Sequence, residues 1–117
     1  NVASVAGLSM ETAYGLMTQY VAAKSGVVGI SQSLARELKP LGITINCVLP
    51  GGMLSPGAMH MPSTPEFDEI RKKNPGAPVT DPDQVARVVY MMTTEVSNFM
   101  HGATVVVDGG ARLMIQQ

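Results

Sequence analysis

Two β-branched segments, each preceded by a helical pattern, constrain the fold of this chain more than any other feature. Residues 43–49 (ITINCVL) and 103–107 (ATVVV) are rich in Ile, Thr and Val, which favour buried strands. Apolar residues recur at helical intervals over residues 16–39 and again over about 82–94. Strands that alternate with helices pair in parallel through right-handed crossovers. The sequence therefore predicts an α/β layered fold with a parallel sheet.

The ends of both predicted helices carry recognisable residues. Pro40 and Gly42 end the first helix, and Asp81 or Asp83 caps the second. Two glycines in the first helix, Gly26 and Gly29, permit close packing on the sheet or on a partner helix. An apolar stripe runs along each helix: Val21, Val28, Leu34 and Leu38 in the first, and Val85, Val88, Val89 and Met92 in the second.

The segment between the two strands reads as a long loop. Residues 54–78 contain five prolines, with a short helix predicted over 65–73. Loops of this length in a compact domain tend to be functional lids or binding loops. His60 in this loop and His101 before the last strand are most simply surface residues, and no carboxylate–His grouping has metal-ligand spacing. We therefore expect no metal site.

Length and composition bound the remaining possibilities. The 117 residues suffice for one small domain, residues 1–117. The net charge of -1 gives no reason to expect a nucleic-acid partner, and no apolar run is long enough to cross a bilayer. The single cysteine, Cys47, excludes an internal disulfide and reads as a small buried side chain. This usage fits a reducing compartment, so we expect a cytoplasmic protein.

One tyrosine and one lysine stand out for their chemistry. Tyr20 and Lys24 are four residues apart on a predicted helix, so their side chains share a face. A phenol ionises near pH 10, and a neighbouring ammonium favours the phenolate, which suits acid–base catalysis nearer neutral pH. A hydroxyl from elsewhere, such as that of Ser4, could hold a substrate oxygen near the phenol. The same spacing also arises on ordinary helix surfaces, so the pair alone does not define a site.

Six segments around this pair occur in the order typical of one family. They are residues 1–7 (NVASVAG), 20–26 (YVAAKSG), 34–38 (LAREL), 42–51 (GITINCVLPG), 81–87 (DPDQVAR) and 102–110 (GATVVVDGG). Together they closely resemble the C-terminal half of the short-chain dehydrogenase/reductase family. The resemblance implies part of a doubly wound, Rossmann-type parallel sheet whose N-terminal half is missing from this sequence. It also implies an oxidoreductase that uses NAD or NADP.

The resemblance assigns roles to particular positions. Tyr20 would be the general acid/base and would also contact the cofactor, and Lys24 would assist it and bind the nicotinamide ribose. Ser4 would bind the substrate oxygen. The stretch of residues 50–55, similar to the family's Pro-Gly-x-(apolar)-x-Thr, would meet the nicotinamide carboxamide: Pro50, Gly51, Met53 through its backbone, and Ser55 through its hydroxyl. Asn46 would be structural.

Three departures from the family pattern matter. The loop between Ser4 and Tyr20 is longer than usual, so Ser9 is a second candidate for the substrate hydroxyl. Ser55 stands where Thr is commoner. The Gly-rich phosphate turn is not in this sequence, because neither residues 51–52 nor 109–110 continue into G-x-G-x-x-G.

The leading hypothesis is therefore an enzyme that interconverts a small-molecule carbonyl and a secondary alcohol. The family resemblance also implies an oligomeric state: we expect a homo-oligomer, either a dimer or a tetramer. The chain by itself is expected to be inactive. One alternative is a truncated or processed, non-catalytic half-domain that acts only in assembly with a missing segment, which the mass of the native protein would test. A catalytically silent binding domain is disfavoured because Ser4, Tyr20 and Lys24 are all present.

Overall fold

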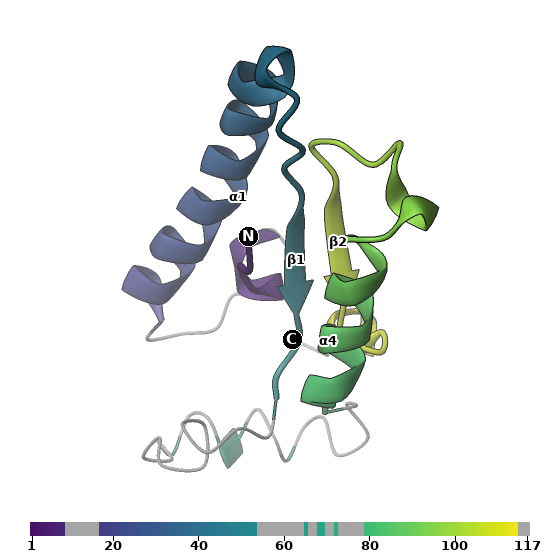
Figure 1. Cartoon of the computed structure of the whole chain (residues 1–117). Coiled ribbons are helices and arrows are strands. Elements are labelled where there is room, and N and C mark those ends of the chain that lie inside the picture. The colour runs from purple at the N-terminus through teal and green to yellow at the C-terminus, as the bar shows by residue number, and fades with distance from the viewer. Residues whose placement is uncertain (9–16, 54–64, 66–67, 70–71, 73–78, 115–117) are drawn as a thin grey trace.

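The computed structural model of the chain describes residues 1–8, 17–53, 65, 68–69, 72 and 79–114 (Figure 1). Helices and strands alternate along these residues, as the sequence predicts. In chain order the elements are η1 (Val5–Leu8), α1 (Thr18–Leu38), η2 (Lys39–Leu41), β1 (Cys47–Pro50), α4 (Pro82–Met91), η3 (Glu95–Ser97), β2 (Thr104–Val107) and α5 (Ala111–Met114).

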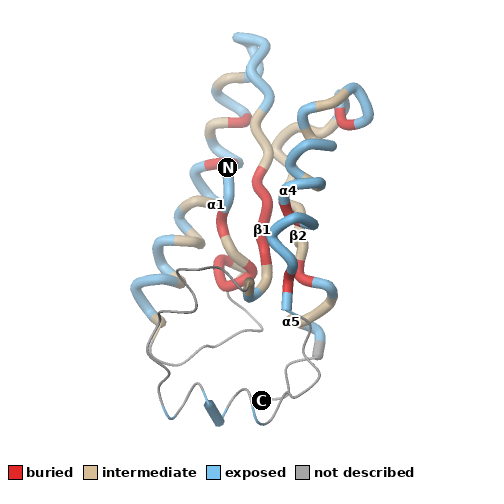
Figure 2. Tube along the Cα trace, turned by 60° about the horizontal axis from the view of Figure 1, so that its bottom comes forward, coloured by how far each residue is buried: buried red, intermediate tan, exposed pale blue. Residues whose placement is uncertain are grey.

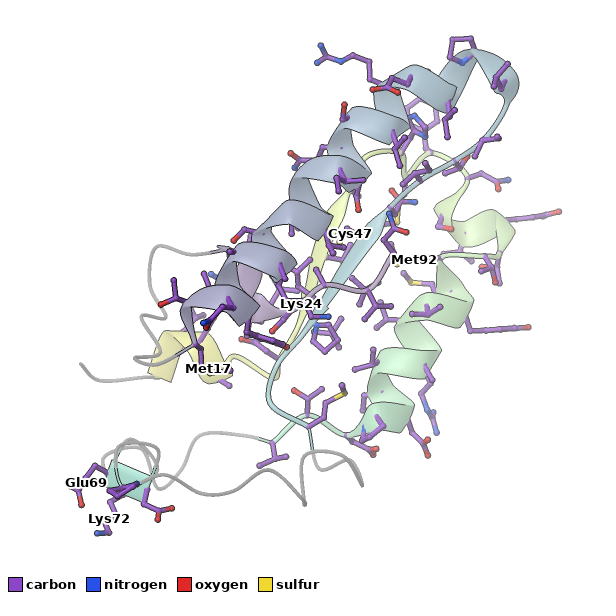
Figure 3. The ribbon with its side chains drawn as sticks, turned by 90° about the vertical axis from the view of Figure 1, so that its left-hand side faces the viewer. Met17, Lys24, Cys47, Glu69, Lys72 and Met92 are labelled. Carbon is purple, nitrogen blue, oxygen red and sulfur yellow. The ribbon has the colours of Figure 1, made fainter. Side chains whose placement is uncertain are left out.

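The strands form a small parallel sheet with β1 at its centre. On one side β1 pairs with β2, with Cys47 opposite Thr104. On the other side Val2 forms a parallel bridge with Val48, supported by a 2.8 Å hydrogen bond from the Ala3 N–H to the Val48 carbonyl. Helix α1 lies against one face of the sheet and α4 against the other (Figures 1 and 3). The predicted α/β layering and parallel pairing are confirmed.

The core lies between β1 and α1. Cys47 and Leu49 are fully buried, and because side chains alternate along a strand they point to the same face. Ala3 and Val5 complete the buried cluster, and Val28 of α1 packs against it. Figure 2 shows the buried residues concentrated along β1 and in the N-terminal segment beside it. The prediction that Cys47 is a small buried side chain is confirmed.

Helix α1 approaches the sheet through small residues. Its buried positions are Ser31 and Ala35, whereas the predicted apolar stripe is only half-buried. The Ser31 hydroxyl donates to the Val27 carbonyl at 2.6 Å, so its polar atom is satisfied within the helix. A Cβ added to Gly26 or Gly29 would meet no atom within 4 Å, so of the two predicted uses of these glycines the structure excludes packing on the sheet. Their packing on a partner helix stays a prediction.

The predicted first strand begins four residues too early. The strand starts at Cys47 because the side chain of Asn46 replaces a backbone hydrogen bond between the strands. Its Oδ1 accepts from the Ala103 N–H at 2.9 Å. The Asn46 Nδ2 donates to the Met100 carbonyl at 3.0 Å. The structural role expected for Asn46 is thereby confirmed.

His101 is half-buried rather than on the surface, because its Nε2 lies 2.7 Å from the Ala35 carbonyl.

Helix α4 is capped by Asp81, whose carboxylate accepts from the Asp83 N–H at 2.9 Å. Of its predicted stripe, Val85 is buried and Val89 is exposed. The helix ends at Met91, three residues before the predicted end.

Four residues of the predicted helix over 65–73 are described, and all four are helical. No helix in the described part of the chain is long and apolar enough to span a membrane.

Candidate active site

The candidate site lies at the carboxyl ends of the parallel strands. Ser4 follows the strand-like residues 1–3, and residues 51–53 follow β1. The N-terminal half of α1, which carries Tyr20 and Lys24, lies at the same end (Figure 1). Ligands of open α/β sheets bind outside the carboxyl ends of the strands. The fold therefore brings the predicted residues to the edge where such a site is expected.

Tyr20 and Lys24 form a pair on one face of α1. The Lys24 Nζ lies 5.7 Å from the centre of the Tyr20 ring, within the range of a cation–π contact. Lys24 is half-buried, and Figure 3 shows it on the side of α1 that faces the carboxyl end of β1. No carboxylate among the described residues pairs with its ammonium. The ammonium is thus available to an acceptor next to the phenol, and the predicted shared face is confirmed.

Ser4 occupies the tight turn between the first strand residues and η1. Its Oγ accepts from the Ala6 N–H at 3.2 Å, and its carbonyl accepts from the Gly7 N–H at 2.9 Å. A hydroxyl has one donor hydrogen besides its lone pairs. Within the described residues the Ser4 O–H has no acceptor, so it can donate to a substrate oxygen.

The turn that carries Ser4 docks directly on α1. A Cβ added to Gly7 would lie 2.8 Å from the Lys24 carbonyl oxygen, so only glycine permits this approach of the two backbones. The Ser25 hydroxyl donates to the Gly7 carbonyl at 3.1 Å. The structure thus joins Ser4's turn to the helix segment that carries Lys24. The sequence analysis missed Ser25, since nothing in its spacing from Gly7 indicates a contact.

A second glycine fixes the segment after β1. A Cβ on Gly51 would lie 2.7 Å from Thr80 Oγ1 and 2.8 Å from Asp108 Cβ. The Gly51 N–H donates to the Val107 carbonyl at 3.0 Å. This N–H is therefore engaged within the sheet and is not available to a cofactor, so a contact from Gly51 would come from its other atoms.

Pro50 and Met53 flank this glycine. Pro50 is buried at the end of β1, and Met53 is half-buried. Met53 forms a parallel bridge with Thr80, in which the Thr80 N–H donates to the Gly52 carbonyl at 2.8 Å. This bond uses none of Met53's own polar atoms. The backbone of Met53 thus remains a candidate contact for a cofactor, as the sequence predicts.

Three other predicted or candidate residues, Ser55, Ser9 and His60, lie outside the described residues. No group of three or more His, Cys, Asp or Glu side chains that could hold a metal ion occurs in the ranges that the structure describes. Of the predicted residues that are described, Tyr20 and Lys24 form a pair, the turn of Ser4 docks beside Lys24, and residues 51–53 lie at the same end of the sheet.

Comparison with known proteins identifies the family. The family model described as enoyl-(acyl carrier protein) reductase matches residues 1–112. The chain is 40% identical over 93 residues to mouse (3R)-3-hydroxyacyl-CoA dehydrogenase, covering 80% of this chain and 36% of that protein. It is 35% identical over 113 residues to cyclohexanol dehydrogenase of Rhodococcus sp. (strain TK6), covering 93% of this chain and 40% of that protein.

A solved structure shares the fold. A 3-oxoacyl-[acyl-carrier protein] reductase from Brucella melitensis, with bound NAD, superposes with a TM-score of 0.72 at 35% identity, covering 96% of this chain and 39% of that one. The chain belongs to the short-chain dehydrogenase/reductase family, and its fold is part of a Rossmann-type fold. It spans well under half the length of these relatives.

Proposed function

We propose that the protein carrying this chain is an NAD(P)-dependent oxidoreductase that interconverts a small-molecule carbonyl and a secondary alcohol. The observation that carries the proposal is the half-buried Lys24 ammonium, which has no anionic partner among the described residues and lies 5.7 Å from the Tyr20 ring. The relatives with dehydrogenase and reductase names support the reaction class.

The described residues fit a nicotinamide cofactor. The ammonium of Lys24, which has no anionic partner in the described part of the chain, suits the hydroxyl oxygens of a ribose, and the Met53 backbone suits a carboxamide. Ser55, the other proposed carboxamide contact, lies outside the described residues. When bound, the nicotinamide ring supplies or accepts the hydride. The bound NAD of the Brucella melitensis reductase supports this choice of cofactor.

The protein's own part is to hold oxygen and move a proton. In oxidation, Tyr20 as phenolate takes the proton from the alcohol oxygen, and in reduction its O–H returns a proton to the carbonyl oxygen. Lys24, whose Nζ lies 5.7 Å from the centre of the Tyr20 ring, would assist this proton transfer and bind the nicotinamide ribose. The spare O–H of Ser4 donates to the same substrate oxygen and orients it. Together these groups set which atom receives the proton.

A homo-oligomer, dimer or tetramer, is part of the proposal. Ile30 on α1 is 58% exposed. Nothing lies within 4 Å of a Cβ built on Gly26 or Gly29, which are nearby on the same helix. Glycine carries no Cβ, so this surface of α1 would allow the close approach of another helix.

The proposal is tested in the native protein by turnover of secondary alcohols and 3-hydroxyacyl thioesters with NAD(H) and with NADP(H). Tyr20→Phe removes the proton-transferring oxygen, so we expect turnover to fall by about 10²-fold or more while NADH affinity stays within twofold. Tyr90→Phe is the control, because Tyr90 is an exposed tyrosine on α4. Turnover retained in Tyr20→Phe would refute the assigned role.

A further inference from the structure

The contact between η1 and α1 links two parts of the proposed site. We infer that Ser25 is a positioning residue, which sets the place of Ser4 relative to Tyr20 and Lys24 through the Gly7 carbonyl. The inference rests on the proposed function, and it adds a residue that the sequence pattern does not single out.

Two contacts at one point define the docking. The Ser25 hydroxyl donates to the Gly7 carbonyl at 3.1 Å. The α-carbon of Gly7 faces the Lys24 carbonyl so closely that a Cβ there would lie 2.8 Å from the oxygen. One contact is attractive and directional, and the other is a steric limit. Together they fix how near the turn stands to the helix and which way its peptide points.

The docking is transmitted to Ser4 within the turn. The Gly7 N–H donates to the Ser4 carbonyl at 2.9 Å, and the Ala6 N–H donates to the Ser4 Oγ at 3.2 Å. A displacement of Gly7 therefore displaces the hydroxyl of Ser4. On the other side, Ser25 directly follows Lys24, in the same helix as Tyr20.

A second hydrogen bond joins the same two segments but lies farther away. The Asn1 Nδ2 donates to the Ser31 Oγ at 2.8 Å. Ser31 is six residues beyond Ser25, about 9 Å along a helix that rises about 1.5 Å per residue. That bond holds the first strand residues, whereas the Ser25 bond acts beside Lys24. Loss of the Ser25 bond thus leaves the strand anchored and releases the turn.

The test compares Ser25→Ala with Ser33→Ala in the native protein. Ser33 is an exposed serine of α1, and its hydroxyl bonds to the Glu37 carboxylate at 3.0 Å, so it is a matched control. A misplacement of about 1 Å can lower turnover by about 10²-fold. We expect Ser25→Ala to lower kcat by about tenfold or more, with the Kd for NADH within twofold of wild type, and Ser33→Ala to change neither.

Two further measurements separate positioning from general stability. Ser25→Thr keeps the hydroxyl, so we expect it to restore kcat to within about threefold of wild type. Hydrogen exchange of the peptide that covers Ala6 and Gly7 should quicken in Ser25→Ala and not in Ser33→Ala, because the turn loses its tether. This readout needs neither cofactor nor turnover.

The outcomes are distinct. If wild type shows no turnover with either NAD(H) or NADP(H), the proposed function fails, while the exchange measurement still tests the tether. If wild type is active and Ser25→Ala matches Ser33→Ala in kcat and in exchange, the inference is overturned. It is also overturned if Ser25→Ala weakens NADH binding as much as it lowers kcat. If Ser25→Ala does not fold, Ser25→Thr decides: activity within threefold of wild type supports the inference, and a tenfold loss in a folded variant overturns it.

Discussion

Gly51 offers the sharpest test of how the segment after β1 is held. In Gly51→Ala the new methyl would lie 2.7 Å from Thr80 Oγ1, 2.8 Å from Asp108 Cβ and 3.1 Å from Asp108 Cα. The first two distances are shorter than side-chain carbons tolerate, and Asp108 cannot turn away because its Cα is part of the clash. The backbone of β1 or of its neighbour must therefore move.

The size of the effect follows from overpacking. An extra methyl in a closely packed site typically costs about 1–3 kcal/mol. Since about 1 kcal/mol shifts the unfolding midpoint of a domain by about 2–8 °C, depending on its size, a cost of about 2 kcal/mol corresponds to a fall of about 4–16 °C. Thermal unfolding followed by circular dichroism measures this shift directly.

Gly52→Ala is the matched control. Gly52 is the next residue and is exposed, and nothing lies within 4 Å of a Cβ built on it. Its substitution is expected to change stability by no more than about 0.5 kcal/mol. If Gly51→Ala and Gly52→Ala unfold at the same temperature, the close approach of Gly51 to Thr80 and Asp108 does not exist in the protein.

Two further substitutions test local features of the fold by the same unfolding measurement. Asp81→Ala removes the side chain that accepts from the Asp83 N–H and should lower the free energy of unfolding by about 1 kcal/mol. Gln84→Ala, in the exposed first turn, should be near neutral. Equal unfolding midpoints in the two variants would contradict the capping role. Asn46→Ala leaves the Ala103 N–H without its side-chain acceptor and should cost about 1–3 kcal/mol; an unchanged midpoint would mean that water replaces the amide.

The sequence predicted those parts of the site that depend on local geometry. Tyr20 and Lys24 share a face because helical spacing alone brings residues four apart together, and the structure confirms this. The Ser25–Gly7 contact escaped prediction because it depends on how closely a turn approaches a helix eighteen residues away. Gly51 was predicted as a cofactor contact, but its close approach to Thr80 and Asp108 was not, since these neighbours come from two other segments.

The fold shows the same division. Periodicity located α1 and α4, yet it assigned the buried stripe of α1 to large apolar residues. The structure buries Ser31 and Ala35 instead, because small side chains let the helix axis approach the sheet. The start of β1 was misplaced because the amide of Asn46 replaces a strand hydrogen bond, and a β-branched run carries no sign of this.

The hydrogen bonds of Asn46 and His101 lie at the amino end of β1, opposite the end that carries Ser4 and Gly51. Four strand residues at about 3.3 Å each separate the two ends by roughly 10–13 Å. Sites more than about 7–10 Å apart without shared partners contribute to stability nearly additively. The sheet thus has these side-chain hydrogen bonds at one end and the proposed active site at the other. Substitutions that strengthen the hydrogen bonds at the amino end should therefore raise thermal stability without disturbing the proposed site at the carboxyl end.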